Sequence, residues 1–302
     1  MPETGSIQSF LDFLKFEKRY SEHTITSYKN DLRDFMEFLD RIYPGTSIPT
    51  ATHSFIRSWL AELKNLGLES SSINRKISSL RSLFKYLLRT GEIEASPMAK
   101  VHGLKTGTRL PAFVKETEAA DLLENLSIHS EDWRSMNASL MIHMFYATGM
   151  RLSELINLKT RQLDLEKKQV KVLGKGNKER IIPLSNELVD LIKEYEKQKT
   201  QLFPEALPDQ ESPLMITEKG RKLYPKYAWN IVNSLLAMTT TLEKRSPHIL
   251  RHSFATHLMN NGADLNAVKE LLGHSSLAAT QVYTHNTIDK LRDIHKKAHP
   301  RG

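Results

Sequence analysis

The chain has 302 residues, which is enough for two domains of ordinary size. Its 43 Lys and Arg residues exceed its 35 Asp and Glu residues, so the formal net charge of +8 favours a polyanionic partner. The absence of cysteine excludes disulfide frameworks, thiolate metal sites and cysteine nucleophiles. No charged segment followed by an apolar run opens the chain, and no stretch approaches about 18 uninterrupted apolar residues. We therefore expect a cytoplasmic protein with no membrane contact.

The first hundred residues have the periodicity of a helical bundle. Apolar side chains recur at three- and four-residue spacing within residues 7–14 and again within residues 25–39. A third helix is predicted between Thr52, its N-cap, and Gly67, and a fourth over residues 71–90. The polar face of the fourth helix combines hydroxyl, amide and cationic groups, as contact with DNA requires, although an ordinary solvated face has the same composition.

The composition changes at residues 96–111, where Pro, Gly and cations gather without periodicity. Such a stretch is typical of an interdomain linker. We therefore predict a helical domain over residues 1–100, a linker over residues 101–111 and a second domain over residues 112–302.

The second half of the chain is mainly helical in pattern and contains one strand region. Residues 169–173 alternate apolar and polar side chains, residues 174–177 supply a turn, and residues 180–183 can return as the partner strand. The tip of this hairpin is basic. The fold class predicted from these patterns is mainly α: an N-terminal four-helix domain and a mostly α domain with a small antiparallel β-sheet.

Two arginines in this half, Arg151 and Arg251, are candidates for holding a phosphodiester. The negative oxygens of a phosphodiester repel nucleophiles, and their charge must be held while the phosphorus becomes five-coordinate. A guanidinium stays protonated and donates two parallel hydrogen bonds, so a pair of arginines meets that requirement. Taken singly, either residue could be a surface cation.

His248 stands at a predicted helix start and shares a helix face with Arg251, three residues later. It is a candidate base for a tyrosine hydroxyl, whose ordinary pKa of about 10 requires help near neutral pH. His248 and His252 also have the spacing of a zinc protease helix, but Ile249 stands where that motif needs glutamate. We predict no metal and no cofactor.

Five short motifs follow one another in this half of the chain. They are Thr148–Leu155, Gly174–Arg180, His248–His252, Leu272–Ser275 and Tyr283–His285. In order and approximate spacing they resemble the tyrosine recombinase (phage integrase) family, and most closely its Xer branch. The resemblance extends over nearly the whole chain and implies that the N-terminal helical domain is the SAM-like, DNA-binding domain of that family.

The resemblance implies a catalytic set composed of Arg151, Lys175, His248, Arg251, His274 and Tyr283. Tyr283 would be the nucleophile, and its attack would leave a 3′-phosphotyrosine and a free 5′ hydroxyl, so that religation needs neither ATP nor metal. Lys175 would protonate the departing 5′ oxygen, with Lys178 and Arg180 as rival donors and an ordinary basic turn as the alternative. From its position three residues after Arg151, Glu154 is expected to orient either Arg151 or the region of His248, with a stabilising first-turn acid as the alternative.

The resemblance also makes several cations candidates for contact with DNA outside the catalytic set. They are Arg75 and Arg81 on the fourth helix, and Lys178 and Arg180 beside the hairpin tip. Residues 286–298 form an apolar stripe with cations opposite. That tail would either pack on its own domain or dock into a neighbouring protomer.

The implied activity is site-specific recombination of double-stranded DNA through a Holliday junction, in chromosome dimer resolution. The implied assembly is a tetramer on two recombination sites, built either from four copies or with a second Xer-like recombinase. The resemblance also makes a septal DNA translocase a candidate partner. The alternatives are a mobile-element integrase, a type IB topoisomerase and a non-catalytic DNA-binding protein.

Overall fold

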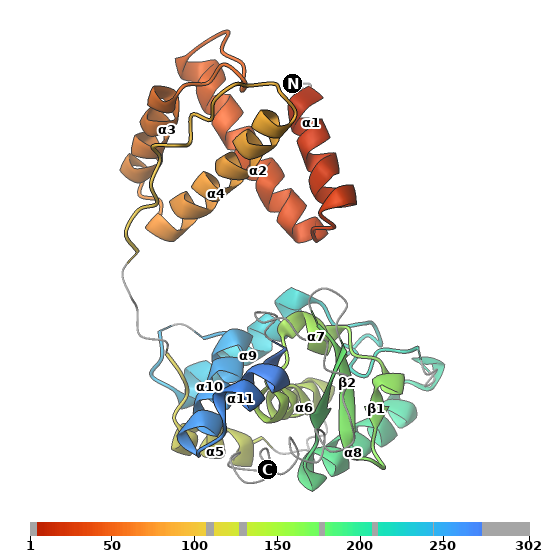
Figure 1. Ribbon diagram of the computed structural model, residues 1–302. Coiled ribbons are helices and arrows are strands. Elements are labelled where there is room, and N and C mark those ends of the chain that lie inside the picture. Colours follow the sequence, from red (N-terminus) through yellow and green to blue (C-terminus); the bar gives the residue numbers. More distant parts are fainter. Residues whose placement is uncertain are drawn as a thin grey trace. The chain divides into compact units, whose positions relative to one another are not determined.

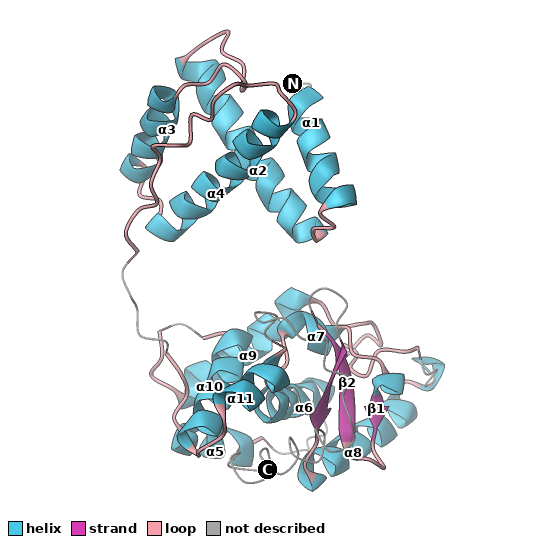
Figure 2. Cartoon of the chain, viewed as in Figure 1, coloured by secondary structure: helices cyan, strands magenta, loops and turns pink. Residues whose placement is uncertain are grey.

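The computed structural model describes residues 5–106, 112–126, 132–174, 179–206, 211–243 and 245–273. The chain divides into two compact units, Met1–Arg109 and Leu110–Gly302. Both are mainly helical, and a small sheet belongs to the second unit (Figures 1 and 2). The predicted fold class is confirmed. None of the helices described is both long enough and apolar enough to cross a lipid bilayer.

The first unit is a bundle of helices around one apolar core (Figure 1). Its elements are α1 (Gly5–Asp12), the π-helical turn η1 (Phe13–Glu17), α2 (Glu22–Ile42), α3 (His53–Asn65) and α4 (Ser70–Arg89). Each helix is amphipathic, so its apolar stripe packs inward; Phe35 of α2 lies 4.9 Å from Trp59 of α3 between ring centroids. Thr52 is the N-cap of α3, as the sequence predicts.

A buried carboxylate ties α2 to α4. Asp31 is 1% exposed and accepts hydrogen bonds from Arg75 (2.6 Å), Lys76 (3.1 Å) and Ser79 (2.8 Å). Three donors satisfy the carboxylate, which would otherwise be costly to bury. The crossing of the two helices is thereby fixed by a polar contact as well as by packing.

The first unit extends beyond the predicted start of the linker at residue 101. Val101 is buried in the N-terminal core, and its carbonyl accepts a hydrogen bond from Arg81 at 2.8 Å. Asn74 bonds both the backbone N–H (2.7 Å) and the carbonyl (2.9 Å) of Leu104. These contacts hold the chain on α4 to at least residue 104, because α4 offers side-chain partners to an otherwise irregular backbone.

The second unit surrounds α6 with helices and carries the sheet on one side (Figure 1). Its helices are α5 (Glu116–Glu124), α6 (Trp133–Thr148), α7 (Leu152–Ile156), η2 (Thr160–Gln162), α8 (Asn186–Leu202), η3 (Pro204–Ala206), α9 (Pro225–Thr239), α10 (Pro247–Asn260) and α11 (Leu265–Leu272). Helix α6 is buried along most of its length and packs against α8, α9 and α10. It is therefore the centre of this core.

The sheet has three antiparallel strands in the order β1-β2-β3. They are β1 (Leu163–Asp164), β2 (Gln169–Leu173) and β3 (Glu179–Pro183). The β2–β3 hairpin is the one predicted, with Val172 opposite Arg180 and Leu173 opposite Glu179. The alternation of β2 buries Val170 and Val172, while β1 is an addition that the sequence patterns did not predict.

Gly149 ends α6 in the left-handed conformation, with φ of +59°. A Cβ at this position would overlap the ring of Phe254 and lie 3.0 Å from Leu272. The position therefore demands glycine for two reasons, the backbone conformation and the closeness of α10 and α11. The turn made here directs the chain into α7 and the start of the candidate site.

Gly149→Ala is expected to destabilise the protein by about 2–5 kcal/mol, the sum of left-handed strain and overpacking. Gly262→Ala is the matched control, because Gly262 has φ of +85° and an added methyl group would meet nothing within 4 Å. It should cost about 1–2 kcal/mol, from the backbone alone. Chemical denaturation followed by circular dichroism measures both, and equal losses would show that the Phe254 contact is unimportant.

Candidate active site

Arg151 lies at the junction of α6 and α7. It is the N-cap residue of α7, and its backbone N–H donates to the Glu154 carboxylate at 2.7 Å. Its guanidinium donates to the same carboxylate at 2.7 Å and to the carbonyl of Gly273 at 3.4 Å. The side chain is 28% exposed, so part of it remains accessible to solvent. A cation at a helix N-terminus is electrostatically unfavourable, which Glu154 offsets.

Arg251 projects from α10 into the interior. It is 8% exposed and donates to the carbonyl of Gly149 at 2.5 Å and to that of Leu272 at 2.7 Å. His248 lies one turn earlier on α10 and is exposed. The order of the motif thus places a buried guanidinium and an accessible imidazole on neighbouring turns of one helix.

The end of α11 is where the arginines meet. Its last carbonyls are on the negative end of the helix dipole, and cations are stabilised there. Three consecutive carbonyls each accept a hydrogen bond from a different arginine: Leu271 from Arg180 at 2.8 Å, Leu272 from Arg251, and Gly273 from Arg151. The two arginines of the predicted phosphate clamp are therefore on adjacent carbonyls, next to the position where the chain continues into His274.

Glu154 is the carboxylate that joins two of these arginines. Arg180 binds it in bidentate fashion, with Nη1 2.9 Å from Oε1 and Nη2 2.8 Å from Oε2. Glu154 and Arg180 have side chains only 4% and 3% exposed. Burial by itself would raise the pKa of Glu154, but the hydrogen bonds from Arg180 and Arg151 outweigh it and lower the pKa to about 2. The carboxylate is therefore ionised at neutral pH.

The site carries more positive than negative charge. The guanidiniums of Arg151, Arg180 and Arg251 lie near one another. Among the described residues that interact with them, Glu154 supplies the one carboxylate. Burial, followed by the positive charge of Arg151, lowers the pKa of Arg251 to about 10. The contribution of Arg151 reflects the positive charge gathered here, which an anion such as a phosphodiester would offset.

The structure brings together two of the six predicted catalytic residues, Arg151 and Arg251, at the end of α11, and a third, His248, lies one turn before Arg251 on α10. The other three predicted catalytic residues, together with one DNA-binding candidate, lie outside the described residues. They are Lys175, His274, Tyr283 and Lys178.

Arg180 does not fit the expectation that it contacts DNA. It is buried, and three of its nitrogens donate to Glu154 and to the Leu271 carbonyl. The physical reason is its place in β3, where a period of two directs it to the same side as the buried Ile182. That alternation was the available sequence signal, and the basic character of the hairpin tip obscured it.

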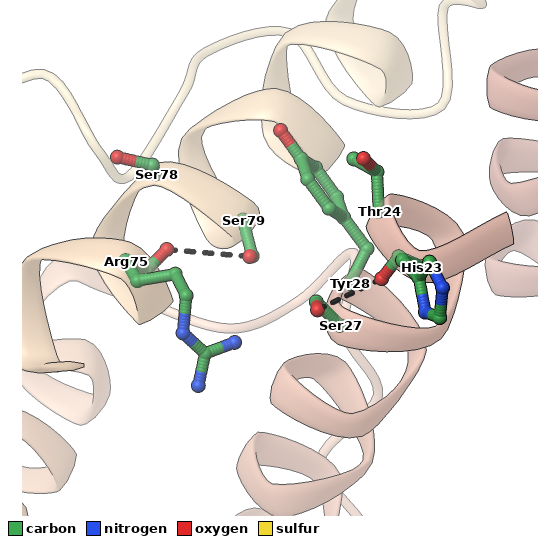
Figure 3. A pocket seen from close by; sticks show the side chains of 7 residues that line it. All are labelled: His23, Thr24, Ser27, Tyr28, Arg75, Ser78 and Ser79. Atoms are coloured by element: carbon green, nitrogen blue, oxygen red, sulfur yellow. Dashed lines mark hydrogen bonds between the residues drawn. The ribbon is translucent and has the colours of Figure 1, made fainter. Parts of the chain in front are cut away.

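A second polar surface lies in the N-terminal unit, between α2 and α4 (Figure 3). The hollow shown there is lined by His23, Thr24, Ser27, Tyr28, Arg75, Ser78 and Ser79. Arg75 is half-exposed at 51% although one nitrogen is held by Asp31, so the side chain stays accessible at the hollow that it lines. Arg81 is also exposed, with one nitrogen donating to Val101. Hydroxyls and a guanidinium held in place suit contacts with phosphates and base edges.

Comparisons with known protein families cover both units. The model described as the phage integrase family matches residues 112–290. The model described as the phage integrase N-terminal SAM-like domain matches residues 7–91. The two matches fall on either side of the irregular segment that follows α4.

Similar proteins extend over the full chain. Tyrosine recombinase XerC of Halalkalibacterium halodurans is 37% identical over 301 residues, which cover 98% of this chain and 97% of that protein. Tyrosine recombinase XerD of Chlorobaculum tepidum is 36% identical and covers 100% and 98%.

Two solved structures show the same fold at lower identity. The XerH site-specific recombinase, in a post-cleavage complex with a palindromic difH substrate, superposes with a TM-score of 0.72 at 23% identity, over 97% of this chain and 82% of that one. The Tn1549 transposon integrase in complex with transposon right end DNA gives a TM-score of 0.70 at 18% identity, over 95% and 98%.

The depressed pKa of Glu154 makes stability depend on pH. A carboxylate whose pKa falls from 4.5 to about 2 on folding stabilises the protein above pH 4.5, and that contribution is lost as the pH falls toward 2. We expect Glu154→Gln to cost about 3 kcal/mol at neutral pH and progressively less below pH 4.5. Chemical denaturation across this range measures the difference from wild type.

Asp190→Asn, which removes an exposed carboxylate on α8, is the control and should show little change. A difference between Glu154→Gln and wild type that stays constant from neutral pH to pH 2 would contradict the assigned pKa.

Proposed function

This chain belongs to the phage integrase family and is a tyrosine site-specific recombinase, and on that premise we propose that Arg151, Arg251 and Tyr283 act on one DNA phosphodiester. The observation that carries the proposal is the convergence of Arg151 and Arg251 on the adjacent carbonyls of Gly273 and Leu272, with more guanidiniums than carboxylates around them. A scissile phosphate supplies the missing negative charge. Its non-bridging oxygens gain charge as phosphorus becomes five-coordinate, and fixed guanidiniums stabilise that state most.

The covalent step is an exchange of one phosphoester for another. The Tyr283 oxygen attacks phosphorus, the bond to the 5′ oxygen breaks, and a 3′-phosphotyrosine is left on the protein. His248, exposed at the start of α10, takes the tyrosine proton. Lys175 gives a proton to the departing 5′ oxygen, and His274 donates a hydrogen bond to the phosphate. Reversal of these steps with a different 5′ hydroxyl joins the exchanged strands.

The N-terminal unit supplies a second surface for duplex DNA. Arg75 and Arg81 contact the backbone or groove edge from α4, and the hydroxyl-lined hollow beside Arg75 contributes neutral donors (Figure 3). Lys178 adds a phosphate contact from the hairpin. Affinity built on such cations falls steeply as salt increases.

The cellular role that we propose is resolution of chromosome dimers in the cytoplasm. It is supported by XerC and XerD relatives that match the chain from end to end. Recombination between two duplexes requires a tetramer on two sites, made of four copies or of two kinds of Xer-like recombinase, and proceeds through a Holliday junction. Residues 286–298 dock between neighbouring protomers in this assembly. A septal DNA translocase is a candidate partner.

Tyr283→Phe should bind recombination-site DNA as well as wild type and form no covalent adduct, because the attacking oxygen is gone. A nicked dimer-resolution site traps the adduct, which denaturing gel electrophoresis detects. Tyr224→Phe, an exposed tyrosine at the start of α9, is the control and should form the adduct normally. An adduct with Tyr283→Phe would move the nucleophile elsewhere.

Lys175→Ala should lose cleavage of ordinary DNA and recover it on a substrate whose bridging 5′ oxygen is replaced by sulfur. A thiolate departs without protonation, so the general acid becomes unnecessary. Lys171→Ala on the neighbouring strand removes an exposed cation that pairs with Glu179, and should cleave both substrates like wild type. A Lys175→Ala protein that binds DNA but is not rescued by sulfur would assign the proton to another donor.

A further inference from the structure

We propose that Arg180 is a positioning residue for the catalytic arginines, acting from within the protein without touching DNA. The inference rests on the proposed phosphate clamp of Arg151 and Arg251. Arg180 lies on β3, and its side chain reaches both α7 and the end of α11. Among the described hydrogen bonds, only Arg151 and Arg180 bond both the Glu154 carboxylate and a carbonyl at the end of α11, Arg151 from the start of α7 and Arg180 from β3.

All three nitrogens of the Arg180 guanidinium donate hydrogen bonds within the protein. Two parallel hydrogen bonds of 2.9 and 2.8 Å hold Glu154, and Nε donates at 2.8 Å to the carbonyl of Leu271. A lysine ammonium could not make this bidentate contact and reach the helix end at the same time. The requirement for arginine therefore follows from the directions of the three bonds as well as from charge.

Glu154 transmits the position of Arg180 to Arg151. The Oε1 atom that accepts from Arg180 also accepts from the Arg151 guanidinium, and Oε2 accepts from both Arg180 and the Arg151 backbone N–H. With Arg180 absent, the carboxylate would keep only Arg151 as a cationic partner among these contacts. Glu154 would then be free to rotate toward Arg151 and draw its guanidinium away from the phosphate.

Arg180 also shapes the end of α11. Gly273 has φ of +64°, and a Cβ there would lie 3.1 Å from Cδ of Arg180 and 3.3 Å from its Nη1. The Arg180 side chain thus lies directly against the C-cap glycine and binds the carbonyl two residues earlier. It holds the helix end from which Leu272 and Gly273 present their carbonyls to Arg251 and Arg151.

Its burial separates Arg180 from Arg151, the more accessible arginine of the proposed phosphate clamp. The side chain is 3% exposed, compared with 28% for Arg151. Loss of Arg180 should therefore slow the chemical step at saturating DNA and leave affinity for DNA unchanged. A displacement of about 1 Å in a catalytic group is enough to slow a reaction by about 100-fold.

The test is single-turnover covalent adduct formation on a nicked recombination site, with DNA affinity measured in parallel. Arg180→Met and Arg180→Lys should each bind DNA within about twofold of wild type and cleave it about 100-fold more slowly. Lys197→Met, which removes an exposed cation from α8, should cleave normally. If Arg180→Met does not fold, Arg180→Lys alone decides the matter, and wild-type cleavage by a folded Arg180→Lys overturns the inference.

A double-mutant cycle with Arg151→Lys shows whether Arg180 acts through Arg151. If it does, the loss of cleavage in Arg151→Lys/Arg180→Lys falls well below the product of the two single losses. Losses that multiply, or a fall in DNA affinity that accounts for the slower cleavage, would overturn the inference. If Arg151→Lys itself cleaves like wild type, the proposed active site is wrong, which is a different outcome from normal cleavage by the Arg180 variants alone.

Discussion

The buried carboxylate of Glu154, shared by Arg151 and Arg180, is the interaction on which the candidate active site depends. Two guanidiniums this close repel each other and are costly to remove from water. An ionised carboxylate between them offsets both costs, as its pKa of about 2 indicates. Because Arg151 donates two hydrogen bonds to the same carboxylate, through its backbone and its side chain, the start of α7 and the guanidinium are fixed together.

Two left-handed glycines make this arrangement geometrically attainable. Gly149 ends α6 where Phe254 and Leu272 leave no room for a side chain, and its carbonyl receives Arg251. Gly273 ends α11 against the Arg180 side chain, and its carbonyl receives Arg151. Both glycines are C-caps, where exposed carbonyls and the negative end of the helix dipole attract cations. The same structural feature therefore terminates a helix and positions an arginine of the candidate active site.

The sequence correctly predicted the features of the fold that depend on residue type and short-range spacing. The N-cap at Thr52 and the β2–β3 hairpin follow from residue type and spacing, and both are present. What it did not predict depends on contacts between distant segments. Asp31 looks like a surface acid on α2, yet it is buried by partners more than 40 residues away on α4. The inward direction of Arg180 was readable from its alternation with Ile182, but its partner Glu154 is 26 residues away.

Arg151 and Arg251 are hydrogen-bonded to backbone carbonyls of the protein, and these bonds orient the two side chains in the absence of substrate. A guanidinium has five N–H donors, and the described hydrogen bonds of Arg251 use two of its nitrogens, one proton each. Carbonyls carry only partial negative charge, so they fix the direction of the side chain without neutralising it. Burial is the main cause of the lowered pKa of Arg251, about 10, and the nearby positive charge of Arg151 adds to it. In the proposed function the phosphodiester is bound by donors that are already oriented, and the free-energy cost of gathering like charges is met during folding, before the substrate arrives.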